Sequence, residues 1–414
     1  KIKKYWSISN KTIFSTAKND IDHEKNLDIL LNNSVRSQMI SDVPIGAFLS
    51  GGIDSSLIVS ILQRHSSSRV KTFTVGFQEK EFNEAAKAKK ISKYLNTDHN
   101  EIYFNSNDVI NLVPELHNIF SEPFADPSSL PTILISKIAR QNVTVALSGD
   151  GGDEIFGGYN RYKFLQKIKN YQRFTPNLLE KLFLKIIKNV PDYFWDHLGK
   201  RMNIDQGSDK IRKIKNILEA DNELEGFKNI LLNTQIYNKI LKKHNEIDFI
   251  AQDIDRGFKK NIKQLMMEID QKYYLSDNIL VKLDRSAMAS SLETRAPFLN
   301  ADVVDYANNL PLHLKINNKF NKVILRNIIK KYLPQKIVDS KKSGFNAPID
   351  IWLRGPLKEW AEDMIYSEKL KNSEYLNHNN IVKLWKEHLS GNKNFYRPLW
   401  SILVFQSWLQ NAKM

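Results

Sequence analysis

The chain has 414 residues, of which 42% are hydrophobic, enough for a large core in about two or three domains. It contains no cysteine, which excludes disulfides, cysteine–zinc sites and thiol nucleophiles. The formal net charge is +15. The basic residues are mostly lysine and widely spread, so we interpret them as solvated helix faces and expect no nucleic-acid partner.

Neither a membrane span nor a secretion signal is expected. The chain has no apolar run of about 18 residues, and its basic start is not followed by a long apolar segment. We therefore expect a cytoplasmic protein with no membrane partner. Residues 1–24 are predicted to be a linker or approach segment.

The first part of the chain alternates between helix and strand patterns. The predicted helices are residues 28–39, 84–95, 107–119 and 131–140, and the predicted strands are residues 43–49, 71–77, 100–104 and 143–147. This alternation predicts an α/β fold with a doubly wound parallel sheet, and a ligand at the carboxyl ends of its strands. Beyond about residue 162 helical spacing dominates, as in residues 178–187 and 249–269, with an exposed loop expected at residues 205–210.

A glycine-rich turn follows the first predicted strand and precedes a helix. It reads Ser50-Gly51-Gly52-Ile53-Asp54-Ser55-Ser56. Glycines let backbone N–H groups approach a phosphate, a helix N-terminus favours negative charge, and the serine hydroxyls add donors. The turn lacks the Gly-Lys-[Ser/Thr] of a Walker A loop. An aspartate beside phosphates requires a cation between them, so Asp54 predicts Mg²⁺ with ATP, and chemistry at the α-phosphate.

A second turn of the same kind follows the strand at residues 143–147. It reads Ser148-Gly149-Asp150-Gly151-Gly152-Asp153-Glu154-Ile155-Phe156-Gly157-Gly158-Tyr159. Because parallel strands end at the same edge of a sheet, the two turns are expected to lie together. Asp54 and Asp153 could then share one metal ion.

These two turns and three later stretches resemble the synthetase half of the glutamine-hydrolysing asparagine synthetase family. The later stretches are residues 284–299, which begin Asp284-Arg285-Ser286, the run Lys342-Ser343-Gly344-Phe345, and residues 395–409. The resemblance covers essentially the whole chain in the family's order. It implies an ATP-pyrophosphatase α/β domain of the adenine-nucleotide α-hydrolase type at residues 25–165, and a mostly helical lobe at 166–414 that completes the active site. It also implies that ATP activates a carboxylic acid as an acyl-adenylate, and that ammonia then displaces AMP.

The resemblance also implies roles for individual residues. Lys342 is expected to stabilise the transition state, although it and Lys341 could instead be solvated surface lysines. Asp150 stands where asparagine-forming relatives usually have glutamate, so it could orient ammonia or accept its proton, or merely support the turn. The residues expected to contact ATP or pyrophosphate are Leu49, Ser50, Gly51, Gly52, Asp54, Ser55, Ser56, Val75, Ser148 and Gly149. Asp54 and Asp153 are the expected metal ligands, and only the backbone of Val75 would be functional.

Charged residues also occur in an apolar context near residue 295. Glu293 and Arg295 are predicted to form an ion pair that organises the edge of the site. Direct substrate contact by Arg285 or Arg295 is the alternative. Four tryptophans at helical spacings, Trp352, Trp385, Trp400 and Trp408, are predicted to pack within the helical lobe rather than to stack on bases.

Two departures from the family pattern bear on the reaction. The nucleophile of the family's glutaminase domain is an N-terminal cysteine, so we expect that domain to be absent here. Either the chain is an excised fragment, or it stands alone and uses free ammonia or ammonia from a partner. Residues 122–132 contain no arginine where asparagine-forming members commonly carry one. This weakens aspartate as the substrate, and Ser128, Ser129 and Thr132 could bind another acid.

Several functions therefore stay open. Amidation of aspartate to asparagine is the first expectation. Amidation of another acid, such as a sugar uronate, and a lactam-forming cyclisation are alternatives within the same chemistry. An RNA-modifying enzyme of the wider pyrophosphate-loop group and a non-catalytic ATP-binding scaffold are more distant. The sequence leaves a homodimer open.

Overall fold

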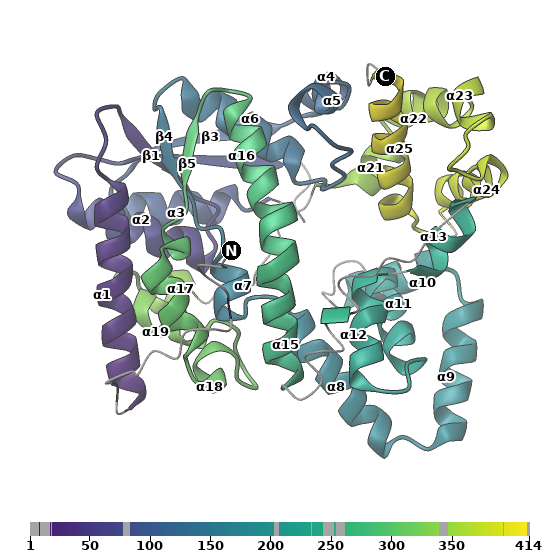
Figure 1. Ribbon diagram of the computed structural model, residues 1–414, viewed down its shortest axis with the longest axis horizontal. Helices are drawn as coiled ribbons and strands as arrows, with labels where there is room; N and C mark the ends of the chain where they lie inside the picture. The colour runs from purple at the N-terminus through teal and green to yellow at the C-terminus, as the bar shows by residue number, and fades with distance from the viewer. Residues whose placement is uncertain are drawn as a thin grey trace, which may run out of the picture. The chain divides into compact units, whose positions relative to one another are not determined.

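The computed structural model describes residues 8, 17, 19–77, 83–202, 207–232, 234–242, 252–253, 261–338, 347–391 and 393–411 (Figure 1). The chain forms two compact units that interleave along the sequence. The sheet unit comprises Lys1–Asn105, Ser128–Asn160 and Met267–Ala347. The helical unit comprises Ser106–Pro127, Arg161–Met266 and Pro348–Met414. The assignment of ATP binding to residues 25–165 stays a prediction.

Five parallel strands form the centre of the sheet unit. They are β1 (Ile45–Phe48), β2 (Lys71–Phe77), β3 (Asp98–Phe104), β4 (Val145–Leu147) and β5 (Glu293–Arg295), in the spatial order β3-β2-β1-β4-β5. This confirms the predicted parallel α/β fold. The chain runs outward from β1 through β2 to β3 and then crosses to the other side of β1. The strand order therefore reverses between β1 and β4, which is where α/β sheets bind ligands.

Helices cover this sheet and supply the rest of the core. They are α1 (Asp20–Gln38), α2 (Ile53–His65), α3 (Ala85–Leu95), α6 (Ser129–Arg140), α7 (Gly152–Phe156), the π-helix η2 (Asp270–Leu280), α16 (Val281–Met288), the 3-10 turn η3 (Pro297–Leu299), α17 (Ala301–Asn308), α18 (Leu312–Lys315), α19 (Val323–Ile329) and α20 (Gln335–Val338). Spacings of four residues put Leu27, Leu31 and Val35 of α1 on one buried face. They share one core with Leu57 of α2 and Ile324 of α19, which fixes these helices against the strands.

The helical unit has α-helices in all of its described secondary structure except a single bridge between Leu241 and Leu376. Its helices are α4 (Ser106–Leu112), α5 (Leu116–Ile119), α8 (Arg161–Phe174), α9 (Asn177–Asn189), α10 (Asp192–Arg201), α11 (Gly207–Leu218), α12 (Glu223–Leu232), α13 (Thr234–Ile240), α21 (Ile349–Arg354), α22 (Lys358–Ile365), α23 (Glu368–Lys371), α24 (His378–Leu389) and α25 (Tyr396–Asn411). The boundary with the sheet unit falls inside α15 (Ile262–Ile269). None of the helices in the described ranges has both the length and the apolar composition of a membrane span.

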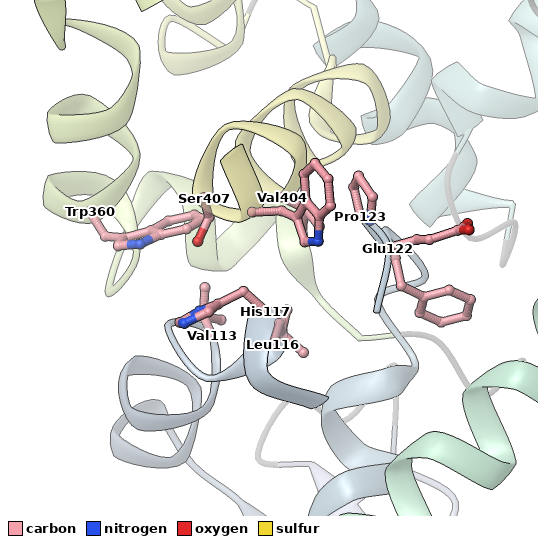
Figure 2. A pocket seen from close by; sticks show the side chains of 10 residues that line it. Val113, Leu116, His117, Glu122, Pro123, Trp360, Val404 and Ser407 are labelled. Atoms are coloured by element: carbon pink, nitrogen blue, oxygen red, sulfur yellow. The ribbon is translucent and has the colours of Figure 1, made fainter. Parts of the chain in front are cut away.

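A small cavity lies within the helical unit, between α5, the segment at residues 122–124, α22 and α25. Figure 2 shows Trp360, Val404 and Ser407 on the side of α22 and α25, and Val113, Leu116 and His117 facing them. Trp408 also lines the cavity, and its indole N–H donates to the Ser121 carbonyl at 3.2 Å. No residue of the predicted nucleotide site lines it. Trp352, Trp385 and Trp400 are buried, which confirms that they pack within the unit.

The structure differs from the predicted elements at three places. Residues 207–210 are not an exposed loop but begin α11, because the Asp196 carboxylate accepts hydrogen bonds from the backbone N–H (2.9 Å) and the hydroxyl (3.1 Å) of Ser208. The helix predicted at residues 107–119 is two helices, interrupted around Pro114. Strand β5 was not predicted at all. The part of the predicted 249–269 helix that precedes residue 261 lies largely outside the described residues.

Candidate active site

The first glycine-rich turn joins β1 to α2 at the point where the strand order reverses. Gly51 has φ +76°, a left-handed conformation that glycine adopts without steric cost. The Ser55 hydroxyl accepts from the backbone N–H of Ser50 at 3.2 Å and lies 3.0 Å from the Ser50 hydroxyl. These bonds hold the turn together over the N-terminus of α2, so backbone N–H groups converge there.

Ser56 offers a further donor beside this turn. Its side chain is buried, and within the described part of the chain its hydroxyl has no hydrogen-bond partner. A buried hydroxyl without a partner costs free energy, which a phosphate oxygen would recover by accepting from it. The turn therefore fits a bound phosphate group.

The second turn packs directly on the first. A Cβ atom on Gly149 would lie 2.7 Å from the backbone nitrogen of Ser55. A Cβ atom on Gly152 would lie 2.7 Å from Cγ of Asp54. Only glycine permits both approaches, so the repeated glycines of the second turn bring the two turns within contact of each other.

A lysine that the sequence did not single out connects the two turns. Lys322 is buried at the start of α19, and its ammonium lies 2.6 Å from Oδ1 of Asp153 and also forms an ion pair with Asp54. Burial lowers the pKa of Lys322, but the charges of Asp153 and Asp54 outweigh it and raise the pKa above its ordinary value. The predicted meeting of Asp54 and Asp153 thus occurs, with a cation between them.

Mg²⁺ fits this donor set only together with a phosphate ligand. Two carboxylates converge, and Mg²⁺ commonly takes one or two carboxylates, with phosphate oxygens and water completing its shell. Among the residues whose placement is described, no group of three His, Cys, Asp or Glu side chains could hold a metal alone. The metal role of Asp54 and Asp153 stays a prediction, and Lys322 already neutralises part of their charge.

The charge of Lys282 acts on Asp150 near the same edge. Burial raises the pKa of the Asp150 carboxyl, while the positive charge of Lys282 and the hydroxyl of Ser148 lower it. Lys282 is itself buried on α16, where its ammonium donates to the Ser128 hydroxyl at 3.0 Å. Asp150 is half-buried, and the positive charge of Lys282 opposes the effect of burial on its pKa.

The next acid of the second turn, Glu154, is almost completely buried. Burial, with the charge of Asp153, raises the pKa of its carboxyl to about 7. The Tyr159 hydroxyl donates to its carboxylate, and the Gln271 side chain donates to its backbone carbonyl at 3.3 Å. Glu154 therefore ties α7 to Tyr159 and to η2, and it titrates near neutrality.

The backbone of Leu49 and Val75, which was predicted to contact ATP, lies at the carboxyl end of the sheet. Leu49 donates from its backbone N–H to Phe73 at 2.9 Å, and its carbonyl accepts from the Thr74 hydroxyl. Val75 is buried on β2 beyond the last residue pair between β1 and β2, at Phe48 and Phe73. Its backbone is thus placed at the carboxyl end of the sheet, as the predicted adenine contact requires. Lys342, the predicted catalytic lysine, lies outside the described residues.

The ion pair predicted at the edge of the site is confirmed. Arg295 Nε lies 2.6 Å from Oε1 of Glu293, and Arg295 Nη1 donates to the backbone carbonyls of Gln38 and Ile40 at 2.7 and 2.9 Å. These contacts attach β5 to the end of α1. The backbone N–H of Ser148 donates to the Arg295 carbonyl at 2.8 Å, so β5 also supports the second turn.

The residues of the segment considered for acid binding differ in their contacts. The Thr132 hydroxyl donates to the Ser128 carbonyl at 2.7 Å inside α6, which is a helix-internal bond. Ser129 is completely buried in the same helix, and within the described residues its hydroxyl has no hydrogen-bond partner. Ser128, by contrast, contacts the Lys282 ammonium, which brings a positive charge to a segment without arginine. The acid-binding role of these residues stays a prediction.

Comparison with known proteins identifies the class to which this fold and site belong. The family described as "Asparagine synthase" matches residues 26–410, so the chain belongs to the asparagine synthase family, a family of ATP-dependent ligases. The "Asparagine synthetase [glutamine-hydrolyzing] 1" of Bacillus subtilis is 33% identical over 91% of this chain and 57% of its own length. The "Putative asparagine synthetase [glutamine-hydrolyzing]" of Mycobacterium tuberculosis is 30% identical over 95% of this chain and 58% of its own length.

A third relative, the "Putative asparagine synthetase [glutamine-hydrolyzing] 2" of Methanocaldococcus jannaschii, is 32% identical over 69% of this chain. The chain thus spans a little over half the length of the relatives it matches most extensively. The predicted family is confirmed. The particular acid and the nitrogen donor of this chain are addressed as proposals below.

Proposed function

We propose that the chain catalyses the ATP-dependent amidation of a carboxylic acid, with aspartate as the acid, asparagine as the product and ammonia as the attacking nitrogen. The observation that carries the proposal is the meeting of two Ser-Gly turns at the reversal point of the sheet. There Asp54 and Asp153 converge on Lys322, and Ser56 presents a buried hydroxyl. Family membership supports the same reaction class.

The proposed reaction has two steps. A substrate carboxylate oxygen attacks the α-phosphorus of ATP, the bond to the bridging oxygen breaks, and pyrophosphate leaves. Ammonia then attacks the acyl carbon, the acyl–oxygen bond breaks, AMP leaves and one proton is released. Mg²⁺ would offset negative charge on the phosphates.

The residues of the site have separate tasks in this proposal. The turn from Ser50 to Ser56 holds the pyrophosphate by backbone N–H and hydroxyl donors, and Lys322 neutralises charge beside it. Asp150 accepts the proton that the attacking ammonia loses, because burial raises the pKa of its carboxyl while the charge of Lys282 limits that rise. Lys342 contributes a further cation at the α-phosphate.

A different acid is the second candidate. Its basis is the absence of arginine in residues 122–132. A positive charge reaches this segment from Lys282, whose ammonium donates to the Ser128 hydroxyl. An ammonium is a point charge and lacks the two-pronged geometry with which arginine holds a carboxylate. Such a site would tolerate an acid whose second anionic group is differently placed, such as a sugar uronate.

Product analysis separates these candidates. The chain is incubated with ATP, Mg²⁺, labelled ammonium and L-aspartate, and AMP and labelled asparagine are measured by mass spectrometry. Equal amounts of AMP and asparagine would support the first candidate. AMP with a labelled uronamide, in parallel reactions with uronates, would support the second, and absence of acid-dependent AMP from every acid would overturn the ligase proposal.

A matched pair of variants links the activity to the site. Asp54→Asn keeps the size of the side chain but removes its charge, so AMP formation should fall by about a hundredfold or more. Asp302→Asn, at an exposed position in the first turn of α17, is the control and should leave the rate unchanged. Equal rates in both variants would remove Asp54 from the mechanism.

A further inference from the structure

Helix α9 lies at the rim of the helical unit (Figure 1). It exposes a continuous apolar face. The exposed fractions are 70% for Leu178, 55% for Leu179, 50% for Leu182, 37% for Phe183 and 50% for Ile186. Spacings of three and four residues put these side chains on one side of the helix. An apolar face of this size is unusual on a surface that meets only water.

A different face attaches the helix to its unit. Ile187 is buried and Leu184 is half-buried, and the Glu180 carboxylate accepts from the Gln172 amide of α8 at 3.0 Å. The five exposed apolar side chains are therefore not the ones that pack α9 into the fold. They are available to a partner without any rearrangement of the helix.

A row of lysines follows one rim of the apolar face. Lys181, Lys185 and Lys188 are spaced by four and three residues, so they lie between the exposed apolar side chains and the face that packs on the unit. All three are exposed, and Lys188 also pairs with Glu219 at 3.1 Å. This row favours an anionic partner. Two copies of α9 packed antiparallel would instead bring the same rim of each helix together and oppose their lysines.

We propose that α9 binds the surface of an anionic lipid bilayer. Its apolar face enters the boundary between headgroups and acyl chains, and Lys181 and Lys185 reach lipid phosphates with their alkyl stems along that face. A helix with leucine and phenylalanine on one side and lysine at the rim is suited to this interface, and contact of this kind needs no spanning helix. The net charge of +15 draws the protein to the same surface.

Vesicle sedimentation tests the proposal with the full chain. The protein should sediment with vesicles of pure phosphatidylglycerol, remain in the supernatant with pure phosphatidylcholine, and dissociate at high salt. The double variant Leu182→Ser/Ile186→Ser should lower the partition coefficient by about tenfold or more, because two apolar side chains lose their burial. Ile351→Ser is the matched control, since Ile351 is 47% exposed and Ile186 is 50% exposed. It should leave the partition unchanged.

The other outcomes would overturn the proposal. Failure to sediment with phosphatidylglycerol would exclude the bilayer as the partner. Binding that the double variant leaves unchanged would assign it to the general basic charge and not to α9. A concentration-dependent dimer that the double variant abolishes, without vesicle binding, would identify a second copy as the partner. Circular dichroism spectra that match the parent protein would establish that each variant is folded.

Discussion

The ammonium of Lys322 lies 2.6 Å from a carboxylate oxygen of Asp153, and the same ammonium contacts Asp54. One buried cation therefore joins the two turns that the nucleotide is proposed to occupy. Its position at residue 322, with φ +54°, is specified by the start of α19 and not by either turn. The two turns thus depend on a residue far along the chain for their charge balance.

Removal of the Lys322 ammonium should destabilise the protein, and it should reveal whether Mg²⁺ binds at Asp54 and Asp153. Lys322→Met leaves two carboxylates facing each other, and we expect the free energy of unfolding in urea to fall by about 3 kcal/mol. Mg²⁺ should then raise the melting temperature of the variant more than that of the parent protein, because it replaces the lost charge. Lys331→Met, which removes an exposed pair with Asp28, is the control and should cost about 1 kcal/mol or less. Equal Mg²⁺ effects in variant and parent would argue against a metal at Asp54 and Asp153.

The close approach of the two turns should not tolerate a methyl group. In Gly149→Ala the new Cβ would meet the Ser55 backbone nitrogen at 2.7 Å, so the turns must separate. We expect a loss of about 1–3 kcal/mol in stability and at least about a tenfold loss in ATP affinity, measured by calorimetry. Gly226→Ala is the control, because its nearest neighbour is the flexible end of Leu165 at 3.0 Å, and alanine favours the α12 helix. Unchanged ATP affinity in Gly149→Ala would show that the contact between the turns does not shape the binding site.

The buried Glu154 carboxyl should give the protein a specific pH dependence. Its pKa is about 7 in the folded chain against 4.5 in the unfolded chain, so between these values only the folded state holds the proton. Its contribution to stability is therefore fully present below pH 4.5 and is lost as pH rises through 7, by up to about 3 kcal/mol. Glu154→Gln cannot titrate, so its stability relative to the parent should increase over this interval in urea titrations. A difference that stays constant with pH would contradict the assignment.

Lys282 should control the acid limb of the activity profile. Its charge lowers the pKa of Asp150, which burial raises. In the proposed mechanism Asp150 must be ionised to accept a proton, so we expect activity to fall as pH falls through that pKa. Lys282→Met should therefore move the acid limb of kcat/KM to higher pH, whereas Lys282→Arg should leave it near its original position. If Lys282→Met lowers the rate but leaves the acid limb of kcat/KM at its original pH, the role of Lys282 is structural.

Much of the sheet and both turns were predictable because their signals are local. Apolar, β-branched runs marked β1, β2 and β4, and glycine next to serine and aspartate marked the turns that follow β1 and β4. Strand β5 carries no such signal, because it has three residues, Glu293 is exposed and its pairing with β4 defines it. Tertiary pairing of this kind is not encoded in a short window of sequence.

The other features that the sequence did not predict depend on contacts between residues far apart in the chain. Nothing near residue 322 indicates that its side chain reaches Asp54 and Asp153, and nothing near residue 282 indicates Ser128 as its partner. The apolar spacing of residues 178–187 predicted a helix, but not which apolar side chains stay exposed. An amphipathic pattern identifies a face without identifying what covers it.

The interleaving of the two units has a consequence for how the protein is made. A ribosome that has translated as far as Asn160 has delivered β1 to β4 and both turns, but neither β5 nor α19. The nascent sheet then has an unpaired edge at β4 and lacks the helix that packs against α2, so apolar surface faces the solvent during synthesis. The sheet unit can close only after residue 329 has left the exit tunnel. Until then we expect the emerging chain to be prone to aggregation, and we expect a fragment cut after the second turn to aggregate rather than bind nucleotide.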